Sequence, residues 1–399
     1  MNFRMFLVLF VILGFRFYFF YSNQPNFASG QEISFETTIL SQPQIIGSQQ
    51  SFTANYEARK IKIITSRFLE INYGSYLRIS GKISNQSDRV LMYFPKVESI
   101  NGSLNFFQLG LQKMVKFAQK LTSLFSETLP SPSSSLLLGI IFGIKEQMPK
   151  DFSDNLKASG VFHVIAASGM NVALVGGFIS TFFTFFFKRQ IAIFFSILGI
   201  IFYAILAGLE PSIIRASIMG VLVFSAQILG RQTLAVNCLF LAGFGMLLAD
   251  PSLISDIGFQ LSFLSTLGIL YVKPILEKKP IISSEILTTI AAQIATLPVL
   301  LVNFGTYSLF SILVNGLVLW TVPILMMFGG AGAILGLIFM PLGQLLVYLC
   351  YPLLLYFEAV VNFFGKIGGI ISIKTFPWQF AAGYYCLLVC VLLIFKKEK

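Results

Sequence analysis

The sequence predicts a polytopic α-helical membrane protein with about 10–11 transmembrane helices and a small exported, OB-like β domain. Three observations predict this class. Hydrophobic residues make up 56% of the 399 residues and charged residues only 11%, whereas soluble proteins carry about 25% charged residues. Beyond residue 132, apolar segments long enough to cross a hydrocarbon core of about 30 Å follow one another. Residues 22–105 alternate apolar and polar side chains, as half-buried β-strands do.

Residues 1–21 form the first predicted element, an uncleaved transmembrane anchor. The segment consists mainly of Phe, Leu, Val and Ile, and no small-residue cleavage site follows it. A secretory signal peptide has a shorter apolar region and ends at such a site. With its amino terminus in the cytoplasm, the anchor exports the residues that follow.

The next two elements are the β domain, residues 22–105, and an amphipathic linker helix, residues 106–132. Apolar residues such as Ile61 and Ile63 alternate with lysines in the first, and several short strands suit a small barrel such as the OB-fold. The second carries Lys113, Lys116 and Lys120 on one side. A basic face beside a membrane block is typical of an interfacial helix, and a plain linker helix is the alternative.

Residues 133–399 form the predicted transmembrane domain. The run 135–144 is too short to span a bilayer and is expected to be re-entrant. Basic loop residues such as Lys188, Arg189 and Arg231 lie in the cytoplasm by the positive-inside rule, so the protein is expected to be a multi-pass protein of the cytoplasmic (inner) membrane. The predicted spans are 161–187, 191–208, 213–230, 234–249, 257–273, 286–302, 309–328, 329–346, 352–371 and 378–395.

Polar residues inside these apolar segments are the candidates for function, because such residues usually face protein or water. His163, Ser168 and Asn171 lie early in one span, and Gly169 permits an interrupted helix there. The alternative is a buried, hydrogen-bonded histidine beside a Ser-Gly pair that packs against another helix.

A second cluster pairs Glu210 at the start of a span with Arg215 one turn deeper. A carboxylate is favoured at a helix amino terminus by the helix dipole. Either the two residues form a structural ion pair, or Arg215 is a fixed positive charge for a passing anion.

A third cluster places Asp256 and Gln260 one turn apart, followed by Ser262. Phe259 and Phe263 on the same segment are candidates for stacking on nucleic-acid bases.

Further along the chain, four polar residues share one face of a predicted helix, which indicates either pore lining or hydrogen bonds between helices. Glu358, isolated in an apolar span, is expected to pair with a residue elsewhere, and Gly332 and Gly336 have a spacing typical of close helix packing. The four residues of the polar face are Glu285, Thr289, Gln293 and Thr296.

Several function classes are excluded. The G-x-x-x-x-G-K-[ST] sequence of nucleotide-binding P-loops is absent, and a chain with a single histidine does not supply the ligands of a binuclear metallohydrolase. The four cysteines lie in apolar stretches and are expected to pack there. We therefore expect no cofactor, no metal, no catalytic residues and no enzymatic activity.

Three segments, in order and spacing, resemble the ComEC family of competence proteins. They are "GIIFGIKEQMPKDFSDNLKASGVFHVIAASGMNVALVGG", "GLEPSIIRASIMG" and "LGRQTLAVNCLFLAGFGMLLADPSLISDIGFQLSFLSTLGI", within residues 135–310. The segment "YGSYLRISGKI" is similar to the OB-like periplasmic domain of that family. Two departures are notable. The family often has histidine where this chain has Asn171, and many members continue into a metallo-β-lactamase-like domain that we expect this chain to lack.

The resemblance implies a channel that imports single-stranded DNA during natural transformation. Its expected partners are single-stranded DNA, membrane lipid, a separate DNA receptor, a cytoplasmic motor or DNA-binding protein, and a separate nuclease. The implied roles are a helix break at Ser168 and Gly169, a phosphate contact at Arg215, and polar lining at Asn171, Gln260 and Ser262. Asp256 is expected to orient its helix.

Two other functions remain open at the level of the sequence. A secondary transporter or flippase for an anionic metabolite or a lipid-linked sugar would use the same broken helix and Arg215. A membrane-bound enzyme acting on a lipid-linked substrate would depend on Glu210, Arg215 and His163.

Overall fold

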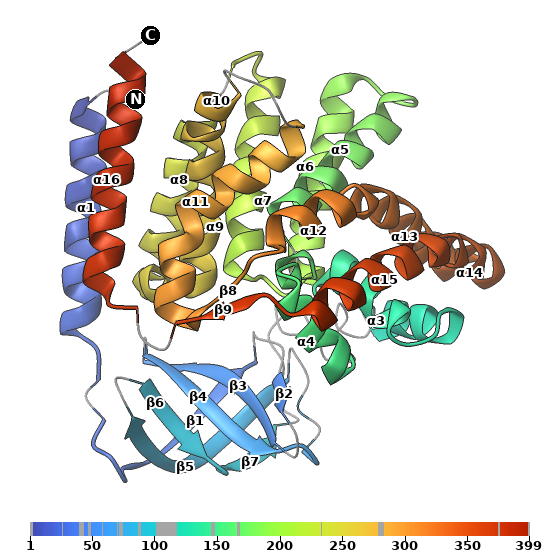
Figure 1. Cartoon of the computed structure of the whole chain (residues 1–399). Coiled ribbons are helices and arrows are strands. Elements are labelled where there is room, and N and C mark those ends of the chain that lie inside the picture. The colour runs from blue at the N-terminus through green and yellow to red at the C-terminus, as the bar shows by residue number, and fades with distance from the viewer. Residues whose placement is uncertain are drawn as a thin grey trace. The chain divides into compact units, whose positions relative to one another are not determined.

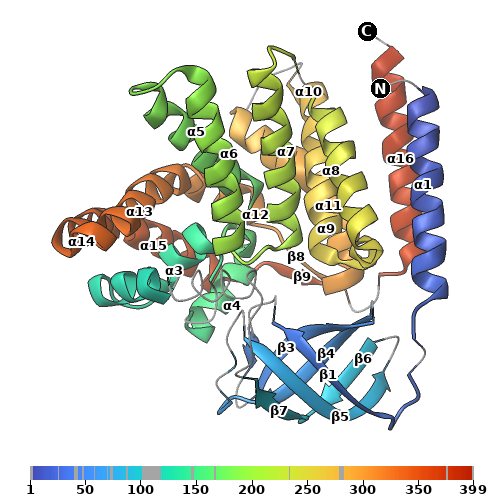
Figure 2. The same ribbon diagram turned by 180° about the vertical axis from the view of Figure 1, so that it is seen from behind.

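The computed structural model of the chain is shown in Figures 1 and 2. It separates into two compact units, one of residues 1–123 with 208–210, and one of residues 124–207 with 211–399. The structure describes residues 3–397 apart from 26, 40–43, 47–48, 58, 70, 72–74, 87–88, 101–116, 118, 145–147, 166–167, 233, 278–282 and 374–375.

The first unit contains helix α1 (Phe3–Ser22) and a small β domain, as predicted. Its strands form one mostly antiparallel sheet in the order β1-β5-β6-β4-β3-β2, with β7 paired to β5 and only the β4–β6 pair parallel. The strands are β1 (Glu32–Thr38), β2 (Gln44–Ile46), β3 (Gln49–Tyr56), β4 (Arg59–Ser66), β5 (Tyr76–Gln86), β6 (Arg89–Tyr93) and β7 (Lys96–Ser99).

The sheet of the β domain is curved (Figures 1 and 2). Its buried residues, which come from several of its strands, form a single hydrophobic core, as in a partly open OB-type barrel. Ile61, Ile63 and Ile79 lie between exposed or half-buried residues along β4 and β5, and they are fully buried in this core together with Met92 of β6.

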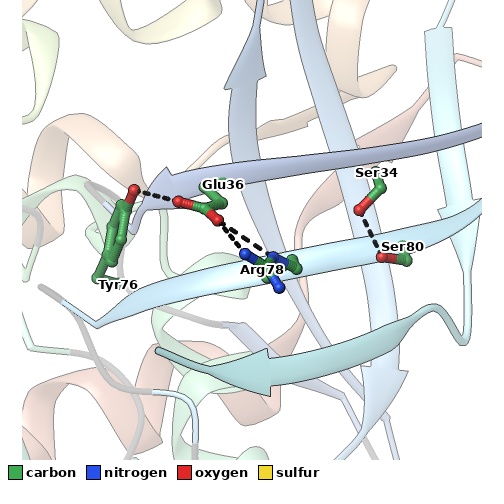
Figure 3. A network of polar contacts seen from close by, with 5 residues as sticks. All are labelled: Ser34, Glu36, Tyr76, Arg78 and Ser80. Atoms are coloured by element: carbon green, nitrogen blue, oxygen red, sulfur yellow. Dashed lines mark hydrogen bonds and ion pairs between the residues drawn. The ribbon is translucent and has the colours of Figure 1, made fainter. Parts of the chain in front are cut away.

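A cross-strand network lies on the outer face of the β1–β5 pair (Figure 3). The Tyr76 hydroxyl donates to Glu36 at 2.6 Å, and the Arg78 guanidinium donates to the same carboxylate at 2.6 Å. Beside them, the hydroxyls of Ser34 and Ser80 are 2.7 Å apart. These hydrogen bonds, first from Tyr76 and then from Arg78, hold the pKa of Glu36 below its ordinary value.

The second unit is helical, and its described part contains eight helices that are long and apolar enough to cross a membrane. In both views α6–α9 and α11 run side by side, and a two-stranded ribbon, β8 (Thr306–Ser308) with β9 (Ile370–Ser372), joins the ends of α11 and α15 (Figures 1 and 2). The helices are α3 (Ser133–Phe142), α4 (Lys150–Ala158), α5 (Gly169–Thr184), α6 (Arg189–Leu206), α7 (Pro211–Ile228), α8 (Ala235–Ala249), α9 (Ile257–Tyr271), α10 (Lys273–Leu276), α11 (Ser284–Phe304), α12 (Ser311–Val318), α13 (Thr321–Ile338), α14 (Met340–Leu349), α15 (Tyr351–Ile367) and α16 (Trp378–Lys397), with 3-10 turns η1 (Phe162–Val164) and η2 (Pro251–Ser255).

The predicted junction between two spans at Gly329 is wrong. α13 runs through Gly329 without interruption and ends before Phe339. The glycine serves packing instead, because a Cβ atom there would lie 2.5 Å from Ile141 Cδ1 of α3. The helix is interrupted at Phe339, and α14 begins after it with Pro341 in its first turn.

The linker helix is described only in part. Residues 119–128 are helical, with Leu121, Leu124 and Phe125 buried and Lys120 exposed. Lys113 and Lys116, the other two lysines of the predicted basic face, lie outside the described residues.

The predicted glycine packing is confirmed between α13 and α14. A Cβ atom at Gly343 of α14 would overlap the backbone of Gly336 in α13, and one at Gly332 would lie 2.9 Å from Val347. Contacts of this kind, in which small residues let two backbones approach, are a main source of helix association in membranes.

The Glu36 network predicts an acid-sensitive component of stability in the β domain. Because the folded-state pKa of Glu36 lies below its ordinary value of 4.5, this component is present above that value and is lost as the pH falls through the lowered pKa. Hydrogen exchange of the full chain, compared at equal pH, should show less protection of β1 and β5 in Glu36→Gln at pH 6. The difference from the parent should shrink under acid.

Glu32→Gln is the matched control for that experiment. It removes the same charge from the same strand, but the Glu32 carboxylate only approaches Lys82, at 3.7 Å, and both side chains are exposed. Exposed pairs of this kind contribute little. An equal loss of protection in both variants would contradict the role of the network.

The α13–α14 contact predicts a position-dependent effect of adding one methyl group. Gly343→Ala should lower the free energy of unfolding by about 1–3 kcal/mol, as overpacking does. In Gly330→Ala, on α13, the new Cβ atom meets nothing within 4 Å, so stability should stay equal or rise slightly with the helix propensity of alanine. Thermal unfolding of the purified chain measures both, and equal effects would refute the contact.

Candidate functional site

The site is built around α3, a short helix inside the helical unit. All ten of its residues are buried, and its length of about 15 Å is half of what a bilayer crossing requires. The last carbonyl groups of any helix lack partners within it. Here Asn171 Nδ2 of α5 donates to the carbonyl of Ile140, and the Tyr203 hydroxyl of α6 donates to that of Ile141, both at 2.8 Å.

The amino end of α3 holds the isolated glutamate of α15. Ser133 Oγ donates to Glu358 Oε1 at 2.5 Å, which confirms that this carboxylate pairs with a distant residue. One turn along α15, Asn362 accepts from Asn155 Nδ2 of α4 at 2.9 Å. A carboxylate beside a helix amino terminus is favoured by the dipole, so α15 is fixed against α3 and α4 by polar contacts.

The structure interrupts the span that was predicted for residues 161–187. A 3-10 turn, η1, carries His163, whose side chain is exposed, and the α-helix begins only at Gly169. Ser168 is the N-cap residue, but its hydroxyl lies 3.1 Å from Asn171 Oδ1 and makes no capping bond to the helix backbone. Asn171, 1% exposed, thus connects the start of α5 with the end of α3.

Arg215 connects three helices. It projects from α7, is 7% exposed, and its Nη1 donates to the carbonyl of Ser262 and the hydroxyl of Thr266, both in α9. Its Nη2 lies 3.0 Å from where a Cβ atom at Gly169 would be. Its Nε is buried and has no described hydrogen-bond partner. Arg215, Gly169 and Ser262 are therefore brought together, whereas Glu210 directly precedes α7.

The remaining polar residues of α9 act within their own segment. Asp256 is the N-cap residue and accepts from the backbone N–H of Phe259 at 2.8 Å. Gln260 Nε2 donates to the carbonyl of Ile254 at 2.8 Å. Both side chains stabilise the entry into α9, the helix that anchors Arg215.

The two phenylalanines of α9 pack against other side chains of the protein. Phe259, 7% exposed, stacks on Phe263 with ring centroids 5.8 Å apart. Phe263 also meets Phe240 of α8, and a Cβ atom at Gly243 would lie 2.8 Å from its ring. Phe259 is thus buried beside Phe263, and the half-buried Phe263 packs against α8. Stacking of these two rings on nucleic-acid bases stays a prediction.

A second polar network was only partly foreseen. Gln293 of α11 donates to Ser311 Oγ of α12 and accepts from the Tyr307 hydroxyl, both at 2.7 Å. Ser311 in turn donates to the carbonyl of Gly160 at 3.2 Å. At Gln293 the polar stripe therefore forms hydrogen bonds between helices. Tyr307 and Ser311 were not predicted, because nothing in their local sequence links them to the polar face of the helix that carries Gln293.

The chemistry-bearing residues offer no metal site in the described part of the chain. No group of three or more His, Cys, Asp or Glu side chains lies close enough to hold an ion there. What the arrangement offers instead is polar side chains inside an apolar helical unit, with Arg215 as a cationic donor and Glu358 as an acceptor.

Comparison with known proteins assigns the family. The family model described as "Competence protein" matches residues 140–398. ComE operon protein 3 of Bacillus subtilis (strain 168) is 23% identical over 205 residues, which make up 51% of this chain and 26% of that relative. The chain thus matches about a quarter of the length of this relative. Because the family model covers well over half of the chain, the resemblance to the ComEC family is confirmed, and the chain belongs to the competence protein family.

Proposed function

We propose that the chain is an inner-membrane channel that passes single-stranded DNA into the cytoplasm during natural transformation. The observation that carries this proposal is the family match over residues 140–398, which supports a role in competence and DNA uptake. The apolar helices supply a multi-pass membrane domain for such a conduit.

The polar cluster of α5, α7 and α9 supports a path for an anionic polymer. A charged side chain at the centre of a membrane helix costs about 2.5–3.5 kcal/mol on insertion scales. A functional role for Arg215 would explain why a charged residue lies in this helix despite that cost. In the proposed channel Arg215 contacts a backbone phosphate. Asn171, Gln260 and Ser262 are the uncharged polar groups beside the path, and sparse charge lets the cargo leave.

The interrupted segment before α5 supports the same path. Non-helical backbone at membrane depth is tolerated where protein or a water-filled cavity satisfies it. The turn at His163 and the start of α5 at Ser168 and Gly169 provide such a segment, and Gly169 lies against Arg215. In transporters, helix ends of this kind contact anionic groups of the substrate.

The energetics require help from other proteins. Moving one negative charge inward against an inside-negative potential costs about 2.3 kcal/mol per 100 mV, and the sequence has no P-loop to couple ATP hydrolysis. We therefore expect a cytoplasmic motor or DNA-binding protein to draw the strand inward. A separate DNA receptor and a separate nuclease, which prepares the single strand, complete the expected set of partners.

Substitution of Arg215 tests the proposal. Arg215→Ala should lower the DNase-protected DNA taken up by cells about tenfold or more, because a hydrogen bond to a charged group contributes about 1.5–3 kcal/mol. Gln260→Ala should lower uptake less, since Gln260 bonds to its own helix entry. Uptake is compared at equal membrane levels of each protein, in cells without another copy.

Arg231→Ala is the matched control for charge. Arg231 is exposed in the loop that follows α7, so its loss should leave uptake unchanged. Undiminished uptake in Arg215→Ala would contradict the channel assignment. Loss of transport of an anionic metabolite with intact DNA uptake would favour a secondary transporter instead.

A further inference from the structure

The guanidinium group of Arg215 is committed on one side only. Its Nη1 donates to the carbonyl of Ser262 and to Thr266 Oγ1, which fixes the plane of the group against α9. The opposite edge, Nε and Nη2, is the edge that binds oxyanions as a fork in proteins. Nε is a buried donor with no described acceptor, and such donors normally find one.

The amino end of α5 lies at this open edge. α5 has sixteen residues and starts at Gly169. A Cβ atom at Gly169 would lie only 3.0 Å from Nη2, so the absence of a side chain lets the guanidinium lie directly against the start of this helix. The N-cap hydroxyl of Ser168 makes no capping bond, because it lies beside Asn171 Oδ1 instead. The positive end of the α5 dipole therefore faces a guanidinium edge, and helix amino termini favour anions.

Two positive features that face each other inside a membrane domain repel one another unless an anion lies between them. More than nine tenths of Arg215 is buried, so water screens it weakly. A phosphate-type oxyanion fits this position in charge, in its several acceptor oxygens and in its match to the planar guanidinium. Gly169 and Ser168 are half-buried, so the amino end of α5 is partly exposed outside the helix packing.

We propose that the open edge of Arg215 and the amino end of α5 form one binding site for a phosphate-type oxyanion. Free inorganic phosphate occupies it in the absence of DNA, and a backbone phosphate replaces it during import. The replacement by a DNA phosphate rests on the proposed function, whereas the oxyanion site itself does not. Ser168 and Gly169 thereby act together with Arg215, instead of marking only a break between helices.

The test measures the melting temperature Tm of the purified full chain in a nonionic detergent without phospholipid. Sodium phosphate is titrated at constant ionic strength, with gluconate as the balancing anion. A ligand that binds only the folded protein stabilises it in a saturable manner, so we expect a saturable rise in Tm. A parent protein whose Tm shows no saturable rise overturns the proposal.

The variants localise the site. Arg215→Gln should weaken the apparent phosphate affinity about tenfold or more. Because Arg215 also holds α9, Gly169→Ala is the second variant, and its Cβ atom would intrude beside Nη2 while the bonds to α9 remain available. Arg231→Gln, in the exposed loop, should retain the parent response. Parent-like affinity in Arg215→Gln or in Gly169→Ala overturns the proposal.

Competition identifies the source of the phosphate. Oligothymidylate should raise the phosphate concentration needed for half of the Tm rise. Competition by micellar phosphatidylglycerol alone would keep the oxyanion site and assign it to a lipid headgroup, which contradicts the DNA part of the proposal. Failure of phosphate binding with intact DNA uptake would overturn the site and leave the channel in place.

Discussion

The helical unit depends on one constraint, namely that backbone polar groups away from water must have hydrogen-bond partners. Helix α3 is too short to cross a bilayer, so its carbonyl end lies within the protein. There Asn171 and Tyr203 take the place that water has at an exposed helix end. Loss of either partner would leave a buried carbonyl unsatisfied, which costs about 1–3 kcal/mol. The positions of α5 and α6 follow from this requirement.

Close backbone packing completes the arrangement that these hydrogen bonds begin. Gly329 brings α13 against the apolar side of α3, and Gly343 brings α14 against α13. On the other side of the unit, a Cβ atom at Gly268 of α9 would overlap the backbone of Ala291 in α11. Because these helices touch through their backbones, α9 has little freedom to shift. The group that α9 anchors, the guanidinium of Arg215, is correspondingly fixed.

The sequence predicts helices and strands well, but it predicts the hydrogen-bond partners of individual side chains poorly. Hydropathy and period-2 alternation depend on neighbouring residues, so the small β domain and most helices are recognisable. A hydrogen bond such as that between Ser133 and Glu358 joins residues 225 positions apart, and no local pattern encodes it. The error at Gly329 has the same origin, because a glycine that ends a helix and one that admits a neighbouring helix look alike in sequence.

The candidate site shows most clearly that the sequence predicts the position of polar residues but not their partners. Spacing singled out Asn171, Arg215 and Ser262 as polar residues in apolar segments, and the structure joins Asn171 to α3 and Arg215 to α9. The same polar segment also singled out Phe259 and Phe263, but Phe263 packs against Phe240 and Gly243 of α8, and Phe259 is buried beside Phe263. Which face of a helix a neighbour covers depends on the fold as a whole. Polar residues in apolar segments therefore indicate where a functional site is possible. The packing of the helices decides which of these side chains retain a surface that can contact a ligand.

The net charge of +11 is less informative about DNA than the direction of one guanidinium group. Much of that charge lies in loops such as those of Lys188 and Arg231, where it reports topology. Arg215 differs because a carbonyl and a hydroxyl of α9 hold its Nη1 side, so its other edge points in a fixed direction. A lysine there would place a point charge without that edge. For a polymer that must bind and then leave, one oriented donor edge beside neutral polar groups suits passage better than a basic patch, which would retain it.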